Sequence, residues 1–249
     1  MNETSSAPAT DTAKTWAVIP IKKLYAAKQR LKTCLTPLQR RRLVEHMLAD
    51  VLLAVGSTPG LAGFSVITAD SNAKILAQHY GAQLIPTSTD NGHSAAVYEA
   101  VKVLLKTGVN RIVALPGDTP FVTADEISQV VSSVNTPDSV TIVSDREGTG
   151  SNCIASKAPL PIPLAFGTNS FAQHCAFIQG AGLQVNNLSL PGLQLDIDTR
   201  EDLLALSAMP TRTKTQALLE DDEYAQALQQ NKRKPSRPFS PDLLGHLVQ

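Results

Sequence analysis

The chain has 249 residues, 43% of them hydrophobic, and its 22 lysines and arginines balance 22 aspartates and glutamates. This length and hydrophobic content fit one large domain or two small ones with a sizeable core. The zero net charge argues against a dedicated nucleic-acid-binding protein, because such proteins usually carry a basic excess. No apolar run approaches the roughly 20 residues of a membrane-spanning helix, so we expect no membrane partner.

The cysteines and the N-terminal segment indicate a cytoplasmic protein. Cys34, Cys153 and Cys175 are widely spaced and form no CxxC pair, which predicts a reduced chain without structural zinc. Residues 1–14 are rich in Ser, Thr and Ala and lack the apolar stretch of a signal peptide. We therefore expect a disordered N-terminal tail.

Short apolar runs alternate with helical patterns, as is typical of an α/β fold. The predicted strands cover residues 16–21, 64–68, 83–86, 111–116, 140–144, 153–155 and 183–190. Helix-start signals stand at Thr36-Pro37, at Thr123 with Glu126, and at Thr199. Beyond Met209 the composition shifts to acidic and basic clusters and prolines, so we predict an appendage over residues 210–249 with a short helix near 215–228.

A pair of aspartates follows the last predicted strand. Asp196 and Asp198 are one residue apart, and in an extended segment their side chains point the same way. Two like charges side by side favour a divalent cation between them, although helix capping and solvation would also explain the pair. Asp118 follows another strand, and because Thr123 caps the next helix, Asp118 is available as a third ligand; an Asx turn is the alternative.

Cations follow the first predicted strand, where ligands of open α/β sheets bind. They are Lys22, Lys23, Lys28 and Arg30. We interpret this loop as an anion-binding segment, with a solvated basic loop as the alternative.

Three small-residue loops offer further donors. Gly92-His93-Ser94 opens a helix, whose free N–H groups suit an anion or a base edge. Gly148-Thr149-Gly150-Ser151-Asn152 and Gly167-Thr168-Asn169-Ser170 supply N–H and hydroxyl donors. His174 lies one turn after Ser170, and we interpret it as a core or surface histidine.

These segments resemble the guanylyltransferases of coenzyme F420 biosynthesis. The resemblance runs from about Trp16 to Leu206 and rests on short motifs in the same order. The motifs are Pro20-Ile21-Lys22-Lys23-Leu24 with Ala27-Lys28-Gln29-Arg30-Leu31, Gly117-Asp118-Thr119-Pro120, Gly148-Thr149-Gly150-Ser151-Asn152, Phe166-Gly167-Thr168-Asn169-Ser170-Phe171 with His174, and Leu195-Asp196-Ile197-Asp198-Thr199 with Asp202-Leu203.

The resemblance implies a Rossmann-like nucleotidyltransferase fold of the glycosyltransferase-A type, with a mixed, mostly parallel sheet flanked by helices over residues 15–209. It implies a GTP-dependent transfer of GMP to a small three-carbon phospho-acid, with release of pyrophosphate. One or two Mg²⁺ ions would serve as cofactor and GTP as co-substrate. A homodimer is an open alternative to a single subunit.

The resemblance also assigns roles to residues of this chain. Asp118, Asp196 and Asp198 would hold the metal, and Lys22 would face phosphate. The nucleotide would lie against Pro20, Lys28, Arg30, Gly92, His93 and Ser94. The acceptor would lie against Thr149, Ser151, Gly167 and Ser170.

The chain departs from the family's common residues on both sides of the expected site. Gly92-His93-Ser94 stands where Gly-Leu-Asn is common, Ser151 where Thr is common, and Thr168-Asn169 where Pro-Gly is common. The polar changes on the acceptor side favour 3-phospho-D-glycerate mildly over 2-phospho-L-lactate and phosphoenolpyruvate. A nucleotidyltransferase for a sugar phosphate or another phosphorylated alcohol, and a non-catalytic nucleotide-binding protein, are the alternatives.

Overall fold

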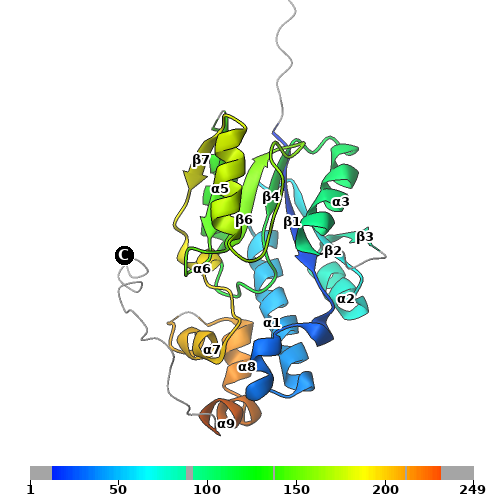
Figure 1. Ribbon diagram of the computed structural model, residues 1–249. Coiled ribbons are helices and arrows are strands. Elements are labelled where there is room, and N and C mark those ends of the chain that lie inside the picture. The colour runs from blue at the N-terminus through cyan, green and yellow to red at the C-terminus, as the bar shows by residue number, and fades with distance from the viewer. Residues whose placement is uncertain (1–12, 88–91, 137, 211, 231–249) are drawn as a thin grey trace, which may run out of the picture.

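A seven-stranded sheet forms the centre of the computed structural model, which describes residues 13–87, 92–136, 138–210 and 212–230 (Figure 1). The strand order is β3-β2-β1-β4-β6-β5-β7. The strands are β1 (Thr15–Ile21), β2 (Gly63–Thr68), β3 (Gln83–Pro86), β4 (Arg111–Ala114), β5 (Ser139–Ser144), β6 (Ser151–Lys157) and β7 (Gln184–Asn187). Only β6 runs antiparallel to its neighbours, β4 and β5, among the described pairings. The predicted mixed, mostly parallel sheet is thus confirmed.

Helices cover both faces of this sheet. They are α1 (Pro37–Gly56), α2 (Ser71–His79), α3 (His93–Leu105), α4 (Ala124–Ser133), α5 (Ser170–Gly180), α6 (Pro191–Gln194), α7 (Arg200–Ser207), α8 (Lys214–Leu219) and α9 (Asp222–Gln230). The side chains of Thr36, Thr123 and Thr199 each accept a hydrogen bond from the backbone N–H three residues on, which confirms the predicted helix starts.

The alternation of side chains along each strand divides the core into two layers. On β1, Ala17 and Ile19 pack in one layer with α1, α2 and α4, whereas Val18 faces the other layer with α3 and α5. All three side chains are fully buried. Both faces are covered by helices, so the carboxyl ends of the parallel strands are left as the open edge for a ligand.

The C-terminal helices pack against α1 (Figure 1). Asp50 of α1 accepts hydrogen bonds from Lys214 N at 2.8 Å, from Thr215 N at 2.9 Å and from Thr215 Oγ1 at 2.6 Å. Tyr224 of α9 is buried in the same core layer, and its hydroxyl donates to Gln39 O at 2.9 Å. The helix expected near 215–228 is therefore two short helices. The domain boundary after Met209 stays a prediction.

The predicted loop after β1 contains two short 3₁₀ helices, Leu24–Ala26 and Gln29–Thr33, which are common in connections. One expectation about local structure is wrong. The strand predicted over 183–190 covers only Gln184–Asn187, because the chain then turns into α6, with Pro191 in its first turn. Residues 1–12 of the predicted tail and residues 231–249 of the predicted appendage lie outside the described residues. In the described ranges, every helix is too short or too polar to span a bilayer.

Candidate active site

The three predicted aspartates meet beyond the carboxyl end of β4. Asp118 follows that strand, and Asp196 and Asp198 follow α6. The backbone joins the two segments, because Ile197 N donates to Asp118 O at 3.1 Å. Gly117 lets this segment pack closely on β1, since a Cβ there would lie 2.2 Å from Ile21 Cδ1 and that side chain would have to move.

Lys28 bridges two of these carboxylates. Its Nζ lies 2.6 Å from Asp118 Oδ2 and 2.7 Å from Asp198 Oδ1, and only 5% of the side chain is exposed. Burial alone would lower the pKa of Lys28, but the charges of Asp118 and Asp198 outweigh it and raise that pKa. Lys28 has a φ of 54°, in the left-handed region that side chains rarely adopt and that recurs at functional sites.

Asp196 and Asp198 have opposite environments. Burial, together with the charge of Asp118, raises the pKa of Asp196 to about 6, although Asn152 Nδ2 donates to its Oδ1 at 3.1 Å. Burial would also raise the pKa of Asp198, but Lys28 reverses this and lowers it. Asp196 is therefore the carboxylate with the least compensated charge, and a bound cation would relieve it.

The carboxylates do not form a preassembled metal cage. Among the described residues, no group of three or more His, Cys, Asp or Glu side chains is arranged to hold a metal ion. Mg²⁺ needs no such cage, because it is usually bound by one or two carboxylates together with waters and substrate phosphates. The repulsion between Asp118 and Asp196 fits a site of that kind. Their role as metal ligands stays a prediction.

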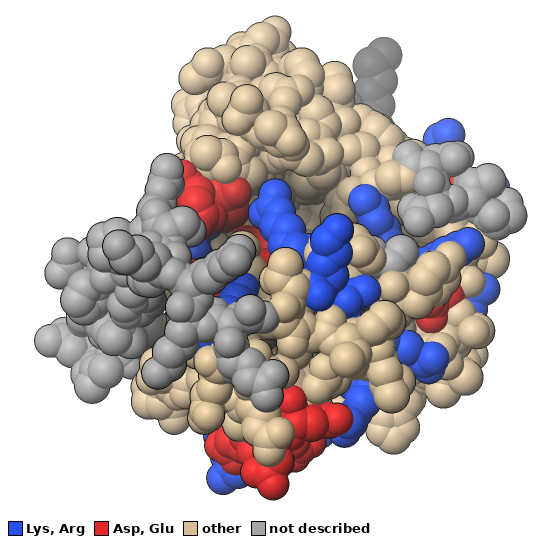
Figure 2. Space-filling view, turned by 60° about the horizontal axis from the view of Figure 1, so that its bottom comes forward, with Lys and Arg blue, Asp and Glu red and all other residues tan. Residues whose placement is uncertain are grey.

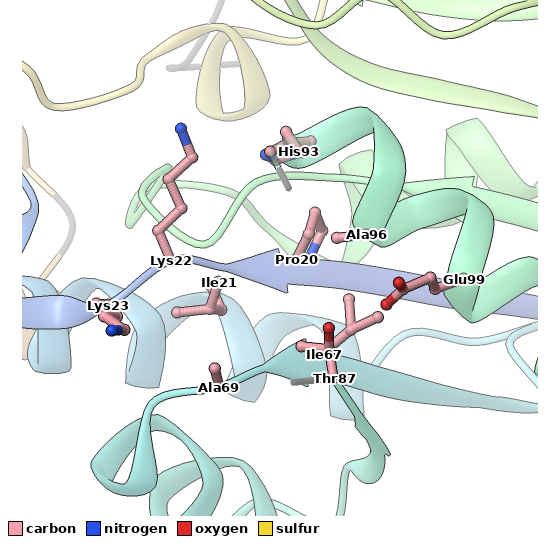
Figure 3. Close-up of a pocket in the computed structure, with 11 residues that line it drawn as sticks. Pro20, Ile21, Lys22, Lys23, Ile67, Ala69, Thr87, His93, Ala96 and Glu99 are labelled. Atoms are coloured by element: carbon pink, nitrogen blue, oxygen red, sulfur yellow. The ribbon is translucent and has the colours of Figure 1, made fainter. Parts of the chain in front are cut away.

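A pocket of about 430 Å³, open to solvent, lies beside these carboxylates at the ends of β1 and β2 (Figure 3). It is lined by Pro20, Ile21, Lys22, Lys23, Ile67, Ala69, Thr87, Gly92, His93, Ala96 and Glu99. On one face of the molecule, lysine and arginine side chains gather beside a hollow (Figure 2). The expected anion-binding loop thus contributes Lys22 and Lys23 to the pocket.

His93 links the pocket to the aspartates. Burial lowers the pKa of His93 to about 4; Asp118 opposes this shift and Lys22 adds to it. The imidazole is therefore neutral near pH 7. The ring of His93 packs edge-on against that of Phe166, with 4.7 Å between the ring centroids. The ring of Phe166 packs in the same way against His174, with 5.2 Å between the centroids.

Ser151, Ser170 and His174 form a buried hydrogen-bonded network. Ser151 N donates to Ser170 Oγ at 2.8 Å, and Ser151 Oγ lies 2.9 Å from His174 Nδ1. Because Ala165 N donates to His174 Nε2 at 2.8 Å, the ring proton is on Nδ1 and points to Ser151. Burial lowers the pKa of His174 to about 4, so the core assignment of this histidine is confirmed.

The comparisons with known proteins agree with this geometry. The chain matches the family described as "Guanylyl transferase CofC like" over residues 15–232. It belongs to this family. The family is one of nucleotidyltransferases, so the chain is a nucleotidyltransferase, and the resemblance stated from its motifs is confirmed.

Similar proteins from several bacteria are named phosphoenolpyruvate guanylyltransferase. The phosphoenolpyruvate guanylyltransferase of Conexibacter woesei is 35% identical over 193 residues, which are 77% of this chain and 86% of that protein. The one from Chloroflexus aggregans is 33% identical and covers 74% of this chain and 93% of its own length. A structure described as a nucleotide-diphospho-sugar transferase, from Desulfovibrio desulfuricans G20, has a TM-score of 0.71 at 16% identity and covers 88% of this chain and 98% of its own; it shows the shared fold.

The predicted nucleotide residues divide into two groups in this family member. Pro20, Gly92 and His93 line the pocket, whereas Lys28 and Arg30 point to Asp198, Arg30 at 3.5 Å. Ser94 is not among the residues that line this pocket, and its Oγ accepts a hydrogen bond from Phe166 N at 3.1 Å.

On the acceptor side, Ser151 and Ser170 lie together, but their hydroxyls are buried and already paired. Thr149 is exposed, and its N–H and hydroxyl are held by Asp145 at 2.8 and 3.2 Å. Gly167 has a φ of 136°, a conformation that favours glycine at the turn before α5.

Sequence reasoning missed Glu99, and it placed Asp202 in a motif without giving it a role in the site. Glu99 lines the pocket from the middle of α3, where a helical carboxylate gives no strand-end signal. Asp202 holds the aspartate loop, because its Oδ2 accepts from Asp198 N at 3.0 Å and from Thr199 N at 2.7 Å. The helix-start pattern at Thr199 was the available signal for Asp202.

Proposed function

We propose that this chain is a GTP-dependent guanylyltransferase of coenzyme F420 biosynthesis. It transfers GMP to the phosphate of a small three-carbon phospho-acid and releases pyrophosphate. The family match and the names of the relatives support the reaction class. The observation that carries the proposal is the position of the lysine-lined pocket beside the carboxylate rim, which consists of Asp118, Asp196 and Asp198. His93 lines the pocket with Lys22 and is close enough to Asp118 for the two to interact electrostatically.

The chemistry suits this arrangement of side chains. An oxygen of the acceptor phosphate attacks the α-phosphorus of GTP, a new P–O bond forms, and the bond between the α-phosphorus and its bridging oxygen breaks as pyrophosphate leaves. Such a transfer requires positioning and charge neutralisation more than a protein nucleophile. Lys22 and Lys23 would bind the β- and γ-phosphates, since both line the pocket beside the carboxylate rim.

Asp118 and Asp196, with Asp198, would hold Mg²⁺, which would supply charge neutralisation between the two phosphorylated substrates. Lys28 keeps Asp118 and Asp198 in place through its two ion pairs. Asp198→Asn assayed for pyrophosphate release tests this role. We expect at least a 100-fold loss of turnover, and near wild-type turnover with Mg²⁺ would exclude Asp198 as a ligand.

The acceptor is a three-carbon phospho-acid, with 3-phospho-D-glycerate preferred over phosphoenolpyruvate and 2-phospho-L-lactate. Thr168 and Asn169 support this preference, because they are exposed polar residues at the start of α5, beside the Ser151–Ser170 pair. An acceptor with an additional hydroxyl needs such a polar neighbour. The names of the relatives favour phosphoenolpyruvate instead.

Steady-state pyrophosphate release with GTP and each acceptor tests the proposal. We expect release that requires both GTP and a three-carbon phospho-acid, with the highest kcat/KM for 3-phospho-D-glycerate. A sugar 1-phosphate serves as the competing acceptor in a parallel assay. Release that is faster with the sugar phosphate, or that needs no acceptor, would contradict the proposal.

A further inference from the structure

The pocket beside the carboxylate rim has opposite charges at its two ends. Lys22 and Lys23 lie at the end of β1, whereas Glu99 projects into the pocket from α3 at the other end (Figure 3). Apolar side chains, including Ile67 and Ala96, lie between them. A nucleoside triphosphate is complementary to this arrangement. Its triphosphate is a polyanion that suits the lysines, and its base at the other end presents hydrogen-bonding edges.

Glu99 has no partner within the described part of the chain. It is half-buried in the middle of α3, and neither a hydrogen bond nor an ion pair to another described residue engages its carboxylate. Other carboxylates near the site are paired, as Asp118 and Asp198 are with Lys28. A carboxylate that lines a pocket and has no protein partner is available to accept hydrogen bonds from a ligand.

The direction of the nucleotide follows from the charges. The triphosphate must lie near Lys22 and Lys23, because these cations adjoin the rim where the α-phosphorus would react. The base then extends along the apolar part of the pocket, between β2 and α3, towards Glu99. A carboxylate in that position accepts hydrogen bonds only.

We infer that Glu99 selects guanine by accepting hydrogen bonds from the N1–H and the N2 amino group of GTP. These two donors are adjacent on the guanine edge and match the two oxygens of a carboxylate. Adenine presents an unprotonated N1 and cytosine an unprotonated N3 on the corresponding edge, so each would face Glu99 with an acceptor. This inference rests on the proposed function, because it assigns the base-recognising residue of the same site.

Wild-type protein supplies the first measurement. Equilibrium binding of GTP, inosine triphosphate and ATP is measured by calorimetry with Mg²⁺ and without acceptor. Inosine triphosphate retains N1–H but lacks the N2 amino group, so we expect about 10- to 100-fold weaker binding than for GTP. ATP should bind more weakly still. Equal affinities for GTP and inosine triphosphate would overturn the inference.

The variant Glu99→Gln supplies the second measurement. The amide keeps the size of the side chain but loses its charge and one acceptor, so we expect about 10- to 100-fold weaker GTP binding and a GTP-to-inosine-triphosphate ratio within about threefold of unity. Glu45→Gln is the matched control, since Glu45 is a helical carboxylate on α1 paired with Arg41, outside the pocket. It should keep the wild-type ratio. An unchanged ratio in Glu99→Gln would also overturn the inference.

The two proposals fail in different ways. If wild-type protein binds GTP selectively but releases no pyrophosphate with any phospho-acid, the proposed function fails and Glu99 keeps its role in base selection. If pyrophosphate release is normal and Glu99→Gln discriminates as wild type does, only the role of Glu99 is wrong.

Discussion

Lys28 Nζ lies 2.6 Å from Asp118 Oδ2, although the two residues are 90 positions apart in the chain. The same ammonium reaches Asp198, 170 positions away. One buried cation therefore ties the loop after β1 to both acidic segments of the site. This explains how three carboxylates can share one edge of the sheet before any substrate binds.

Lys28→Met should destabilise the metal-free protein. It should also reduce the activity of the protein with Mg²⁺. Removing the ammonium leaves Asp118 and Asp198 without compensation, which we expect to cost about 1–3 kcal/mol in the free energy of unfolding. The value is below that of a fully buried pair because 32% and 41% of these carboxylate side chains remain exposed. Urea unfolding with chelator measures it. Unchanged stability would show that the ion pairs contribute nothing in solution.

Gly192→Ala should displace the segment that carries Asp196 and Asp198, although Gly192 itself lies in α6. A Cβ on Gly192 would lie 2.3 Å from Glu126 Oε2 and 2.5 Å from Phe121 O, and Gly192 N donates to Glu126 Oε1 at 2.7 Å. We expect a loss of about 1–3 kcal/mol from overpacking and a reduced kcat, because α6 leads directly to Asp196.

Gly180→Ala is the control, since among the described residues no atom outside the neighbouring helix backbone lies within 4 Å of the added carbon. Its stability should equal or slightly exceed that of wild type. Equal melting temperatures for both variants would show that α6 can shift freely.

His174 should make the protein sensitive to acid. Its folded-state pKa of about 4 lies below the ordinary 6.5, so between these values the unfolded state binds more protons than the native state. The free energy of unfolding therefore falls as the pH falls from 6.5 to 4, by about 3 kcal/mol for this residue.

The variant His174→Gln isolates this effect. The stability difference between wild type and His174→Gln should shrink as the pH is lowered from 7 towards 4.5. Chemical unfolding at several pH values measures this difference. A constant difference for His174→Gln would show that the buried ring does not control acid stability.

Asp50→Ala should loosen the C-terminal helices. Asp50 accepts three hydrogen bonds from the start of α8, so its removal leaves buried donors unsatisfied and costs about 2–4 kcal/mol locally. Hydrogen exchange in residues 214–230 should accelerate. Asp222→Ala, at the exposed start of α9, should change exchange little. Equal exchange in wild type and Asp50→Ala would show that apolar packing alone holds these helices.

Part of this site can be predicted from local sequence. Asp118 and the Asp196–Asp198 pair follow apolar runs, and Thr123 and Thr199 carry recognisable helix-start patterns, so the elements and their acidic ends are local signals. Connection rules limit the possible strand orders, but local sequence does not select the observed order β3-β2-β1-β4-β6-β5-β7.

The pairing of side chains cannot be predicted in the same way. Lys28 reaches Asp118 and Asp198 through a left-handed backbone, which no periodicity indicates in a non-glycine residue. Glu99 resembles any exposed helical glutamate until the fold places it opposite Lys22. The same holds for Asp50, whose partners lie 164 and 165 positions away. Such contacts depend on tertiary packing.

A competition experiment tests the proposed reaction most directly. The protein is incubated with GTP, Mg²⁺ and equimolar 3-phospho-D-glycerate, phosphoenolpyruvate and 2-phospho-L-lactate, and the products are identified by mass spectrometry. We predict GMP joined through a diphosphate linkage to a three-carbon acid, mainly 3-phospho-D-glycerate, with one pyrophosphate released per product. Recovery of all three acids unmodified, with GTP intact or hydrolysed, would contradict the guanylyltransferase reaction.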